Sequence, residues 1–195
     1  MALPPTPITA PSEPDTRSRI LTAAQRLFRK RGYHATGLND ILELAHAPKG
    51  SMYHHFPGGK EAIGVCVIKE IAQGLLGLLA QSRARSTEAL VLQVGEKLSV
   101  TMEKTDYEIC ALFSAFAAER KSSPLLGIAV ATAYEGLVAA IAARLQQDGL
   151  APRAAQDKAL MVTALLEGGS LLSQAQQNSA AFRLSYKQAA ALCKL

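Results

Sequence analysis

The stretch that decides the fold is LNDILELAHAPKGSMYHH, at residues 38–55. Its first half carries apolar residues at the spacing of a short amphipathic helix, namely Leu38, Ile41, Leu42 and Ala45. A tight turn at His46 and Ala47 follows, and Pro48 is suited to the first position of another short helix that runs to about His55. Two short helices joined by a turn of a few residues are typical of a helix-turn-helix.

A further helix is predicted on the N-terminal side. It begins near Asp15, a good N-cap, and ends at Gly32, which suits a left-handed C-terminal cap. Its apolar residues recur at helical spacing: Ile20, Ala23, Ala24, Leu27 and Phe28. The middle helix of the unit opens at Thr36 or Gly37. We therefore expect three short helices within residues 15–60.

The last of these three helices opens with residues suited to a DNA major groove. That groove is about 12 Å wide, so the leading residues of an inserted helix must be small or carry donors. The sequence offers Pro48, Lys49, Gly50 and Ser51. Gly50 costs about 1 kcal/mol of helix propensity relative to alanine, which is reasonable if the backbone must approach DNA closely. Further donors follow within two turns from Tyr53, His54 and Lys60, and the helix that begins near Lys60 can receive a phosphate at its N-terminus.

The charge is concentrated in the same part of the chain. The 195 residues carry a formal net charge of +5, of which +4 falls within residues 1–60 and +1 in the remainder. A basic block at one end of an otherwise neutral chain indicates a polyanionic partner, because phosphate contacts release counterions and supply much of the affinity. The alternative is that the charge serves solubility alone.

Several short motifs of this region carry a family resemblance. They are Gly32-Tyr33, Ala35-Thr36, Asp40-Ile41, Lys49-Gly50-Ser51-Met52-Tyr53-His54-His55-Phe56 and Lys60-Glu61. On these residues, in register over about residues 17–64, the sequence resembles the TetR family of bacterial transcriptional repressors. The Pro57-Gly58-Gly59 link, together with Pro48-Lys49-Gly50-Ser51, is similar to the LmrA/YxaF-like branch.

The resemblance implies an N-terminal three-helix DNA-binding domain followed by a larger helical domain for effector binding and dimerisation. It implies a repressor that binds a palindromic operator as a dimer and is released by a small apolar or aromatic effector. Within the motif, it implies that Lys49, Ser51 and Tyr53 face the groove or its walls. It also implies phosphate contacts, from Thr36, His54 and Lys60.

The sequence departs from the family pattern at two positions. Gly37 stands where Ser or Thr is common, and His46 stands where the turn usually has Gly. Glycine is an acceptable N-cap, and histidine enters left-handed conformations more readily than most residues. We therefore expect the motif to survive, without the phosphate contact that a hydroxyl at residue 37 would make.

The aromatic residues and histidines of the last helix of the motif also have a purely structural interpretation. Phe56 is expected to pack inside the small domain, and Tyr53 to combine ring packing with a hydroxyl that faces phosphate. Adjacent helical residues diverge, and no Cys, Asp or Glu stands at ligand spacing nearby, so His54-His55 is not expected to bind metal.

The arginines of the first helix have two interpretations. One group is expected to form a solvated face, namely Arg26, Arg29, Lys30 and Arg31. Arg17 and Arg19 stand near the N-terminal tail, from which they could reach an adjacent minor groove as homeodomain arms do.

Beyond this unit the chain is expected to be all-α. Five of the nine prolines fall in residues 4–14, so residues 1–14 are predicted to be a disordered tail. No useful alternation of β-branched and polar residues occurs, whereas Ala and Leu recur at helical spacing. Further helices are expected near 60–80, 86–104, 108–120, 124–147, 153–177 and 180–194, about nine in total. We expect a DNA-binding domain at 15–60 and an effector-binding and dimerisation domain at 61–195.

Cysteine usage and hydropathy indicate a soluble cytoplasmic protein. The three cysteines, Cys66, Cys110 and Cys193, give neither an even disulfide set nor the close pairs of a zinc or redox motif. The first residues lack the features of a signal peptide, and no unbroken apolar run reaches about 18 residues. No membrane partner is expected.

The second part of the chain does not have the residues of an enzyme. All four histidines lie in residues 1–60, and the acidic residues of the remainder are scattered. Acid-base chemistry and metal-dependent hydrolysis are therefore not expected, nor is a cofactor. Ser170 follows two glycines, but without a histidine in this part it is a poor nucleophile.

The last two predicted helices are expected to form the dimer interface. One stripe at three- and four-residue spacing comprises Ala164, Gly168, Leu171 and Leu172, and another comprises Phe182, Tyr186 and Ala190. In a monomer these residues would be core, whereas in the TetR family the equivalent helices form a four-helix interface. A dimer is also expected because one short helix recognises too few base pairs. Two recognition helices about 34 Å apart match the two halves of a palindrome.

A ligand cavity is expected among the remaining apolar and aromatic residues, with Glu135 or Glu167 as isolated polar groups. The candidate lining residues are Met102, Tyr107, Phe113, Phe116, Tyr134, Met161 and Leu165. Two alternatives remain: an architectural DNA-binding protein without effector, and a small-molecule carrier or enzyme that retains a relic helix-turn-helix. A cavity above about 300 Å³ would favour the ligand-responsive hypothesis.

Overall fold

The computed structural model describes residues 15–109 and 113–194. Within them, the chain forms helices and no strand, which confirms the all-α prediction. The elements are α1 (Thr16–Arg31), α2 (Leu38–Leu44), α3 (Lys49–His55), α4 (Gly59–Gln81), α5 (Thr87–Lys104), α6 (Ser114–Ala117), the 3-10 helix η1 (Ala118–Arg120), α7 (Pro124–Gln147), α8 (Pro152–Gln176) and α9 (Ala180–Leu192). The predicted tail at 1–14 and Cys110 lie outside the described residues.

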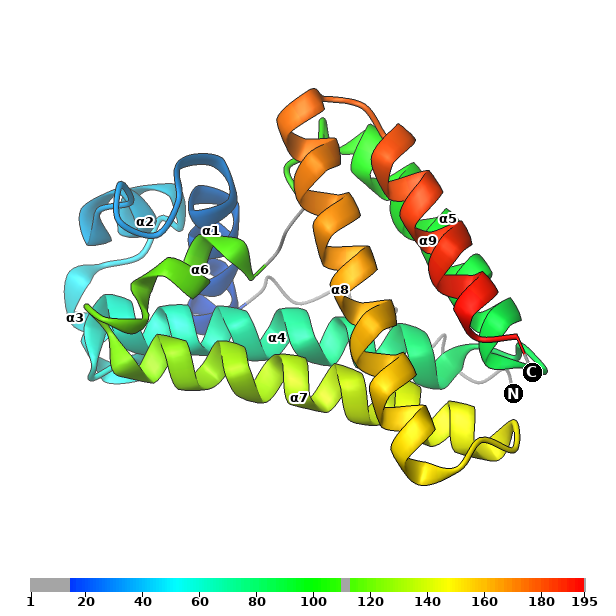
Figure 1. The fold of residues 1–195 in the computed structure, drawn as a ribbon. Helices are drawn as coiled ribbons and strands as arrows, with labels where there is room; N and C mark the ends of the chain where they lie inside the picture. The colour runs from blue at the N-terminus through cyan, green and yellow to red at the C-terminus, as the bar shows by residue number, and fades with distance from the viewer. Residues whose placement is uncertain (1–14, 110–112, 195) are drawn as a thin grey trace, which may run out of the picture.

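The long helices α4 and α7 pack side by side and connect the two ends of the molecule (Figure 1). Helices α1, α2 and α3 gather at one end of this pair, and α5, α8 and α9 gather at the other. The N-terminal helix-turn-helix and the larger C-terminal helical domain therefore share a common pair of helices.

The boundaries of α1 follow the expected capping signals. The Asp15 side chain accepts a hydrogen bond from the Ser18 backbone N–H at 2.7 Å, and this bond lowers the pKa of the exposed Asp15 carboxyl. At the other end, Gly32 has φ 77°, and its N–H donates to the Phe28 carbonyl. Only glycine adopts that backbone conformation readily, so the helix ends there.

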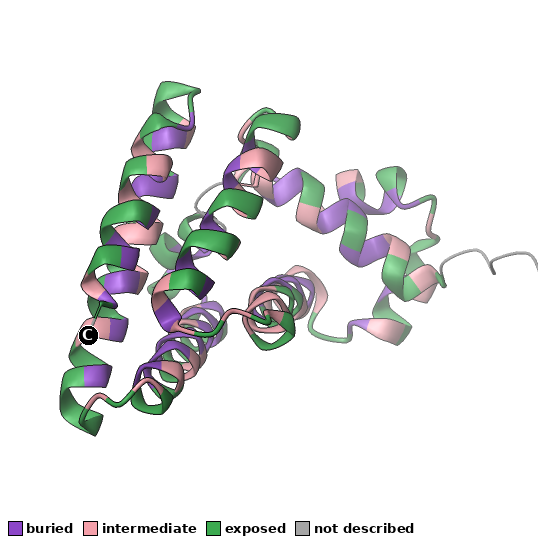
Figure 2. Ribbon diagram, turned by 90° about the vertical axis from the view of Figure 1, so that its right-hand side faces the viewer, coloured by how far each residue is buried: buried purple, intermediate pink, exposed green. Residues whose placement is uncertain are grey.

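One hydrophobic core extends from the helix-turn-helix into the rest of the molecule. It contains residues of α1 such as Ile20 and Phe28, Ile41 of α2 and Met52 of α3, all nearly inaccessible to solvent. The same cluster continues along α4 and into α7. Figure 2 shows buried segments where helices face one another and exposed segments on their outer sides. The core is therefore continuous across the two parts of the chain.

The helix predicted at 108–120 forms in its second half. Among the residues described there, 108–109 and Phe113 lie in turns, and Ser114–Ala117 and Ala118–Arg120 are helical. Just upstream, Asp106 and Tyr107 have left-handed φ values of 48° and 59°. A regular helix cannot pass through two such residues, so α5 does not continue into this segment, as the predicted break between residues 104 and 108 required.

Two helices are of membrane-spanning length, although neither contains an unbroken apolar run of about 18 residues. Helices α4 and α7 contain 18-residue windows of mean hydropathy 1.7 and 1.8 with few charges, enough by length and composition to cross a membrane. In α7, however, 44% of the window is buried inside the protein, and α4 packs directly against α7. A core helix of a soluble protein passes the same test, so the two helices are weak evidence for a span.

Candidate nucleic-acid interface and ligand cavity

Helix α3 has a buried face with apolar side chains and an exposed face with small and polar side chains. Met52 is fully buried and Phe56, at its C-cap, is 2% exposed, so both anchor the helix in the core as predicted for Phe56. The predicted DNA-facing residues are exposed, with Ser51 half-buried: Pro48, Lys49, Gly50, Tyr53 and His54. Pro48 is the N-cap of α3 rather than its first helical residue, one position earlier than expected. The outer face therefore has the small and donor-bearing residues that a major groove accepts.

The two residues that depart from the family pattern lie at the two ends of α2. His46 adopts φ 49°, as expected for a histidine in a glycine position. Gly37 is the N-cap of α2, and its backbone N–H donates to Asp40 Oδ2 at 3.2 Å. Asp40 also lies 3.5 Å from the Arg31 guanidinium, which ties α2 to the end of α1. The glycine N-cap is thus supported from the third position of the helix.

Thr36 does not lie where a phosphate contact requires. Its side chain is fully buried, and its hydroxyl donates to the Gly32 carbonyl at 2.8 Å. The implied phosphate contact is therefore wrong, since DNA cannot reach the group. Thr36 instead satisfies a carbonyl at the end of α1 and fixes the path of the chain into α2.

Lys60 lies against the connection between α1 and α2. Its Nζ lies 4.3 Å from the centre of the Tyr33 ring and 3.4 Å from the His34 carbonyl oxygen. Partial burial lowers the pKa of its ammonium group, and the nearby Glu119 carboxylate opposes this shift. A phosphate contact from Lys60 would require the side chain to leave this cation–π position.

Gly50 has no structural reason to be glycine. Its φ is not positive, and a Cβ atom built at this position would meet no protein atom within 4 Å. Gly50 is the second residue of α3, where glycine lowers helix propensity by up to about 1 kcal/mol relative to alanine, so the choice is unexplained by the packing of the protein itself. Close approach of the helix backbone to DNA supplies a reason.

The basic residues of α1 divide between solvent and contacts within the protein. Arg26, Lys30 and Arg31 are exposed, as expected for a solvated face. Arg29 differs, because its Nε is buried without a partner and burial lowers the pKa of its guanidinium. Arg17 stacks over the Phe56 ring at 5.6 Å, so this arginine contacts the helix-turn-helix itself.

No metal site is formed by the histidines of α3. The His54 and His55 rings lie 5.2 Å apart at a steep angle. In residues 15–109 and 113–194, no group of three or more His, Cys, Asp or Glu side chains is placed to hold a metal ion.

A polar contact that the sequence did not predict joins the helix-turn-helix to η1. His34 Nε2 lies 3.1 Å from Glu119 Oε2, and the carboxyl also accepts a hydrogen bond from Ser122 Oγ at 2.8 Å. Glu119 is almost fully buried, whereas His34 is exposed. The partners are 85 residues apart in the sequence, and no local pattern signals such a contact.

An apolar cavity of about 120 Å³ lies between the helices of the C-terminal part. Its walls come from α4, α5, α7, α8, α9 and the segment between α5 and α6: Leu75, Leu79, Val94, Leu98, Met102, Ile109, Phe113, Tyr134, Leu137, Ile141, Thr163, Leu166, Glu167, Ser170 and Phe182. Met102, Phe113 and Tyr134 therefore lie where the sequence predicted. The cavity is smaller than the 300 Å³ that would by itself favour a ligand-responsive protein.

Four predicted cavity residues lie elsewhere. Phe116 packs against the Phe28 and Tyr33 rings at 5.5 and 5.9 Å, because α6 reaches back to the helix-turn-helix. Tyr107 and Leu165 pack into separate hydrophobic clusters, and Met161 is 53% exposed on α8. Periodicity identifies such residues as apolar but does not show which helix they meet.

Among the lining residues that the sequence analysis did not predict, two carried a signal in the sequence. Leu75 and Leu79 stand four residues apart on the apolar face of the helix predicted at 60–80. The second half of that helix therefore forms a wall of the cavity. The same helix thus reaches from the helix-turn-helix to the cavity.

The polar pair in the cavity is Tyr134 and Glu167. The Tyr134 hydroxyl donates to Glu167 Oε1 at 2.7 Å, between α7 and α8. Burial raises the pKa of the Glu167 carboxyl, and the Tyr134 hydrogen bond opposes this shift. Burial also raises the pKa of the Tyr134 hydroxyl, reinforced by the carboxylate beside it. Glu135, the other candidate, is exposed and outside the cavity.

The predicted interface residues divide sharply between the two last helices. On α8, Ala164, Gly168, Leu171 and Leu172 are exposed and available to a partner. On α9, the prediction is wrong for Phe182, Tyr186 and Ala190, which are at most 3% exposed within this chain.

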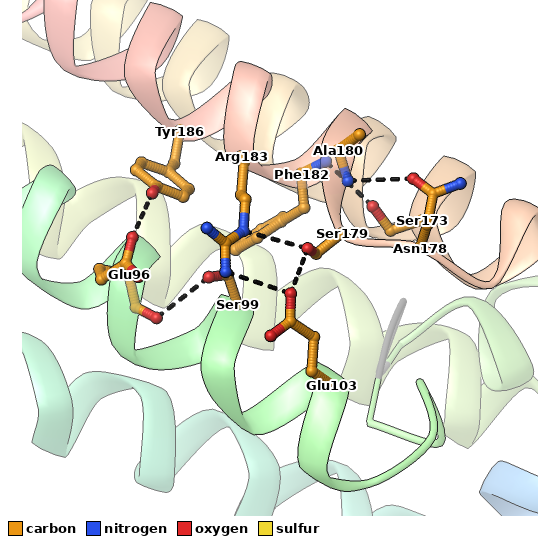
Figure 3. Close-up of polar contacts among 10 residues, drawn as sticks. All are labelled: Glu96, Ser99, Glu103, Ser173, Asn178, Ser179, Ala180, Phe182, Arg183 and Tyr186. Carbon is orange, nitrogen blue, oxygen red and sulfur yellow. Dashed lines mark hydrogen bonds and ion pairs between the residues drawn. The ribbon is translucent and has the colours of Figure 1, made fainter.

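Contacts with α5 explain why these α9 residues are buried. The Tyr186 hydroxyl donates to Glu96 on α5, and Arg183 and Ser179 both contact Glu103 (Figure 3). The face of α9 that was assigned to a second subunit therefore packs against α5 of the same chain.

The two adjacent glycines of α8 have different surroundings. A Cβ atom on Gly169 would overlap the Ser185 side chain of α9, so glycine is required for the close approach of α8 and α9. A Cβ on Gly168 would meet nothing within 4 Å, and this glycine faces outward. Gly168 therefore leaves the outer surface of α8 smooth beside the exposed Leu171 and Leu172.

Comparisons with known proteins agree with this architecture. Residues 20–63 match the model of bacterial regulatory proteins of the tetR family, and residues 87–188 match the C-terminal domain of LmrA/YxaF-like transcriptional regulators. The chain is 34% identical over 171 residues to the HTH-type transcriptional regulator LmrA of Bacillus subtilis, covering 85% of this chain and 89% of that protein. It is 33% identical over 167 residues to YxaF of the same organism, covering 83% and 86%.

Solved structures share the fold. The TetR transcriptional regulator from Legionella pneumophila superposes with a TM-score of 0.81 at 21% identity, covering 91% of this chain and 97% of that one. The reduced form of NemR from E. coli superposes with a TM-score of 0.73 at 23% identity, covering 90% and 95%. The family matches and the relatives are transcriptional regulators, not enzymes. This chain belongs to the TetR family of DNA-binding transcriptional regulators, within its LmrA/YxaF-like group.

Proposed function

We propose that this regulator is a cytoplasmic, homodimeric repressor that binds a palindromic operator through α3 and releases it when a small apolar effector binds. Residues 15–60 would read DNA and residues 61–195 would dimerise and bind the effector. The observation that carries the proposal is the division of α3 into a buried anchor and an exposed face with Lys49 and Tyr53.

The outer surface of α8 and α9 supports dimerisation. Leu171 and Leu172 of α8 are 51% and 54% exposed, and Leu184 of α9 is 62% exposed. Large apolar side chains this exposed on two neighbouring helices favour a protein interface. A symmetric dimer also supplies the second recognition helix that a palindrome requires.

The DNA-binding part is tested by selecting genomic fragments bound by the full chain and then measuring affinity for the selected sequence. Lys49→Ala combined with Tyr53→Ala should weaken operator binding by more than roughly 30-fold, since each lost contact is worth about 1–3 kcal/mol. Lys97→Ala, which removes an exposed lysine of α5, is the matched control and should leave affinity unchanged. Unchanged binding by the double variant would refute the assignment of α3.

The dimer is tested by Leu171→Glu combined with Leu172→Glu. Buried like charges on a two-fold interface should convert the dimer to a monomer in analytical ultracentrifugation and abolish operator binding. Leu125→Glu is the control, because Leu125 is 57% exposed on α7, away from this surface. A monomeric wild type, or a double variant that remains dimeric, would contradict the proposed interface.

A second candidate function is an architectural DNA-binding protein without effector. The small size of the cavity favours it over a carrier or an enzyme. The same selection separates the two: a repressor enriches one palindromic sequence, whereas an architectural protein enriches none. Effector release further requires differential affinity for the DNA-bound and free states.

A further inference from the structure

Glu167 is an unusual group for the place in which it lies. The described walls of the cavity are leucine, isoleucine, valine, methionine and aromatic side chains, with Thr163 and Ser170 as the neutral polar residues. The Thr163 hydroxyl is engaged with the Ala159 carbonyl of its own helix. Among these wall residues, Glu167 and Tyr134 are the ones that titrate, and no Lys, Arg or His is present.

A carboxyl group in such walls has two ways to avoid an uncompensated charge. It can take up a proton, in line with the raised pKa of Glu167, or it can pair with a cation. Tyr134 donates a hydrogen bond to Oε1, which favours the ionised form and fixes the orientation of the carboxylate. The described walls of the cavity provide the hydrogen-bond donor that orients the carboxylate, the Tyr134 hydroxyl, but no cation.

Aromatic side chains stand around the same space. The Phe113 and Tyr134 rings lie 5.0 Å apart in an edge-to-face arrangement, and Phe182 contributes a third ring to the walls. Ring faces attract cations, and the attraction is stronger when water is excluded. A carboxylate and several rings together are the features that recognise an ammonium group attached to an apolar body.

The size of the cavity limits that body. Its volume of about 120 Å³ is similar to the roughly 150 Å³ of an engineered apolar cavity that holds benzene. The cavity therefore accommodates about one aromatic ring, and a short chain on that ring requires the walls to move outward.

We propose that this cavity binds a lipophilic monocation, a single aromatic ring bearing a protonated amine, with Glu167 as the counter-ion and Tyr134 as the residue that positions it. The proposal rests on the proposed function only for the consequence of binding, which is release of the operator. Ligand recognition follows from the cavity itself.

The test uses three probes that share a phenyl ring: 2-phenylethylamine, 2-phenylethanol and 3-phenylpropionate. Calorimetry on the full chain at pH 7.5 should show the amine binding at least tenfold more tightly than the alcohol, with no binding of the carboxylate. Absence of amine binding, or an alcohol or carboxylate that binds as tightly, would overturn the proposal.

Variants then assign the interaction to the carboxylate. Glu167→Gln should weaken amine binding at least tenfold and leave the alcohol unchanged, because it retains the shape and removes the charge. Tyr134→Phe should weaken the amine by a smaller factor, because the counter-ion remains. Glu135→Gln removes an exposed carboxylate of α7 and should leave the amine unchanged. Equal amine affinity in wild type and Glu167→Gln would overturn the assignment.

Operator release is measured separately, by adding each probe to the preformed complex with selected DNA. Amine binding that leaves the complex intact supports the ligand assignment and contradicts the effector role. Amine binding that dissociates the complex in wild type but not in Glu167→Gln supports both.

Discussion

The helix-turn-helix and the pair α8–α9 were predicted from the same kind of pattern, with different success. In α3 the residues expected to face outward are exposed and Phe56 is buried. In α9 the residues expected to face a partner pack against α5 instead. A short helix with one apolar side has one way to pack, whereas long helices that are apolar on several sides have neighbours in more than one direction. Periodicity finds the apolar residues and does not assign the neighbour.

Glycines sharpen this comparison, because the two regions use them for opposite purposes. Gly95 of α5 is crowded, since a Cβ atom there would overlap the Tyr186 side chain of α9. A Cβ atom on Gly50 of α3, by contrast, would meet no neighbouring atom within 4 Å. The first glycine should matter for folding and the second for an external partner.

The largest effect is expected for Gly95→Ala. The added methyl group should displace Tyr186 and lower the free energy of unfolding by about 2–3 kcal/mol, in the range for overpacked cores. For a chain of this size, the melting temperature should fall by roughly 5–10 °C in calorimetry.

Gly74→Ala is the matched control for this change. Gly74 lies within α4, and a Cβ there would meet no atom within 4 Å. The substitution should stabilise the protein by up to about 1 kcal/mol. If both variants have the same stability, the close packing of α5 and α9 within one chain is contradicted.

A smaller effect is expected for Thr36→Val. The variant keeps the shape but removes the hydrogen bond to the Gly32 carbonyl, so unfolding should become easier by about 1–2 kcal/mol in urea titrations. Operator affinity of the folded variant should match that of wild type. A loss of operator affinity of about tenfold in a folded Thr36→Val variant would restore Thr36 as a phosphate contact.

Gly50→Ala should separate folding from DNA binding in the helix-turn-helix. Helix propensity predicts a gain in stability of up to about 1 kcal/mol, because nothing in the protein opposes the methyl group. Operator affinity should fall about tenfold, which corresponds to about 1.4 kcal/mol. Improved stability with unchanged affinity would show that the backbone of α3 does not approach DNA closely at this residue.

The smallest effect concerns the pH dependence of stability in Glu167→Gln. The pKa of Glu167 is raised in the folded state, so the folded protein loses stability as the carboxyl ionises with rising pH. The neutral variant avoids this loss. Its advantage in melting temperature should vanish below about pH 4.5 and grow as pH rises above that value. An advantage that is independent of pH would contradict a desolvated carboxyl.

Local signals were sufficient for much of the fold. Asp15 and Gly32 set the ends of α1, and the spacing of apolar residues located the longer helices within a few positions. The outward face of α3 followed from the same reasoning. These features depend on residues within one or two turns of each other, so the sequence contains them directly.

The remainder depends on contacts between distant segments. Lys60 packs against Tyr33, which is 27 residues away in the sequence, and Phe116 packs against the helix-turn-helix instead of the cavity. The hydrogen bond from Thr36 to the Gly32 carbonyl is local, but the helical spacing of apolar residues does not report it. No spacing rule reports which of several apolar surfaces a side chain meets.

The continuous core has a consequence for the cooperativity of unfolding. Ile63, Val67, Ile68 and Ile71 of α4 complete the same cluster that holds α1, α2 and α3. A fragment that stopped at residue 60 would lose this support and expose the inner side of its own helices. The helix-turn-helix is therefore part of one cooperative unit with the C-terminal domain, and the two should unfold in a single thermal transition rather than in two.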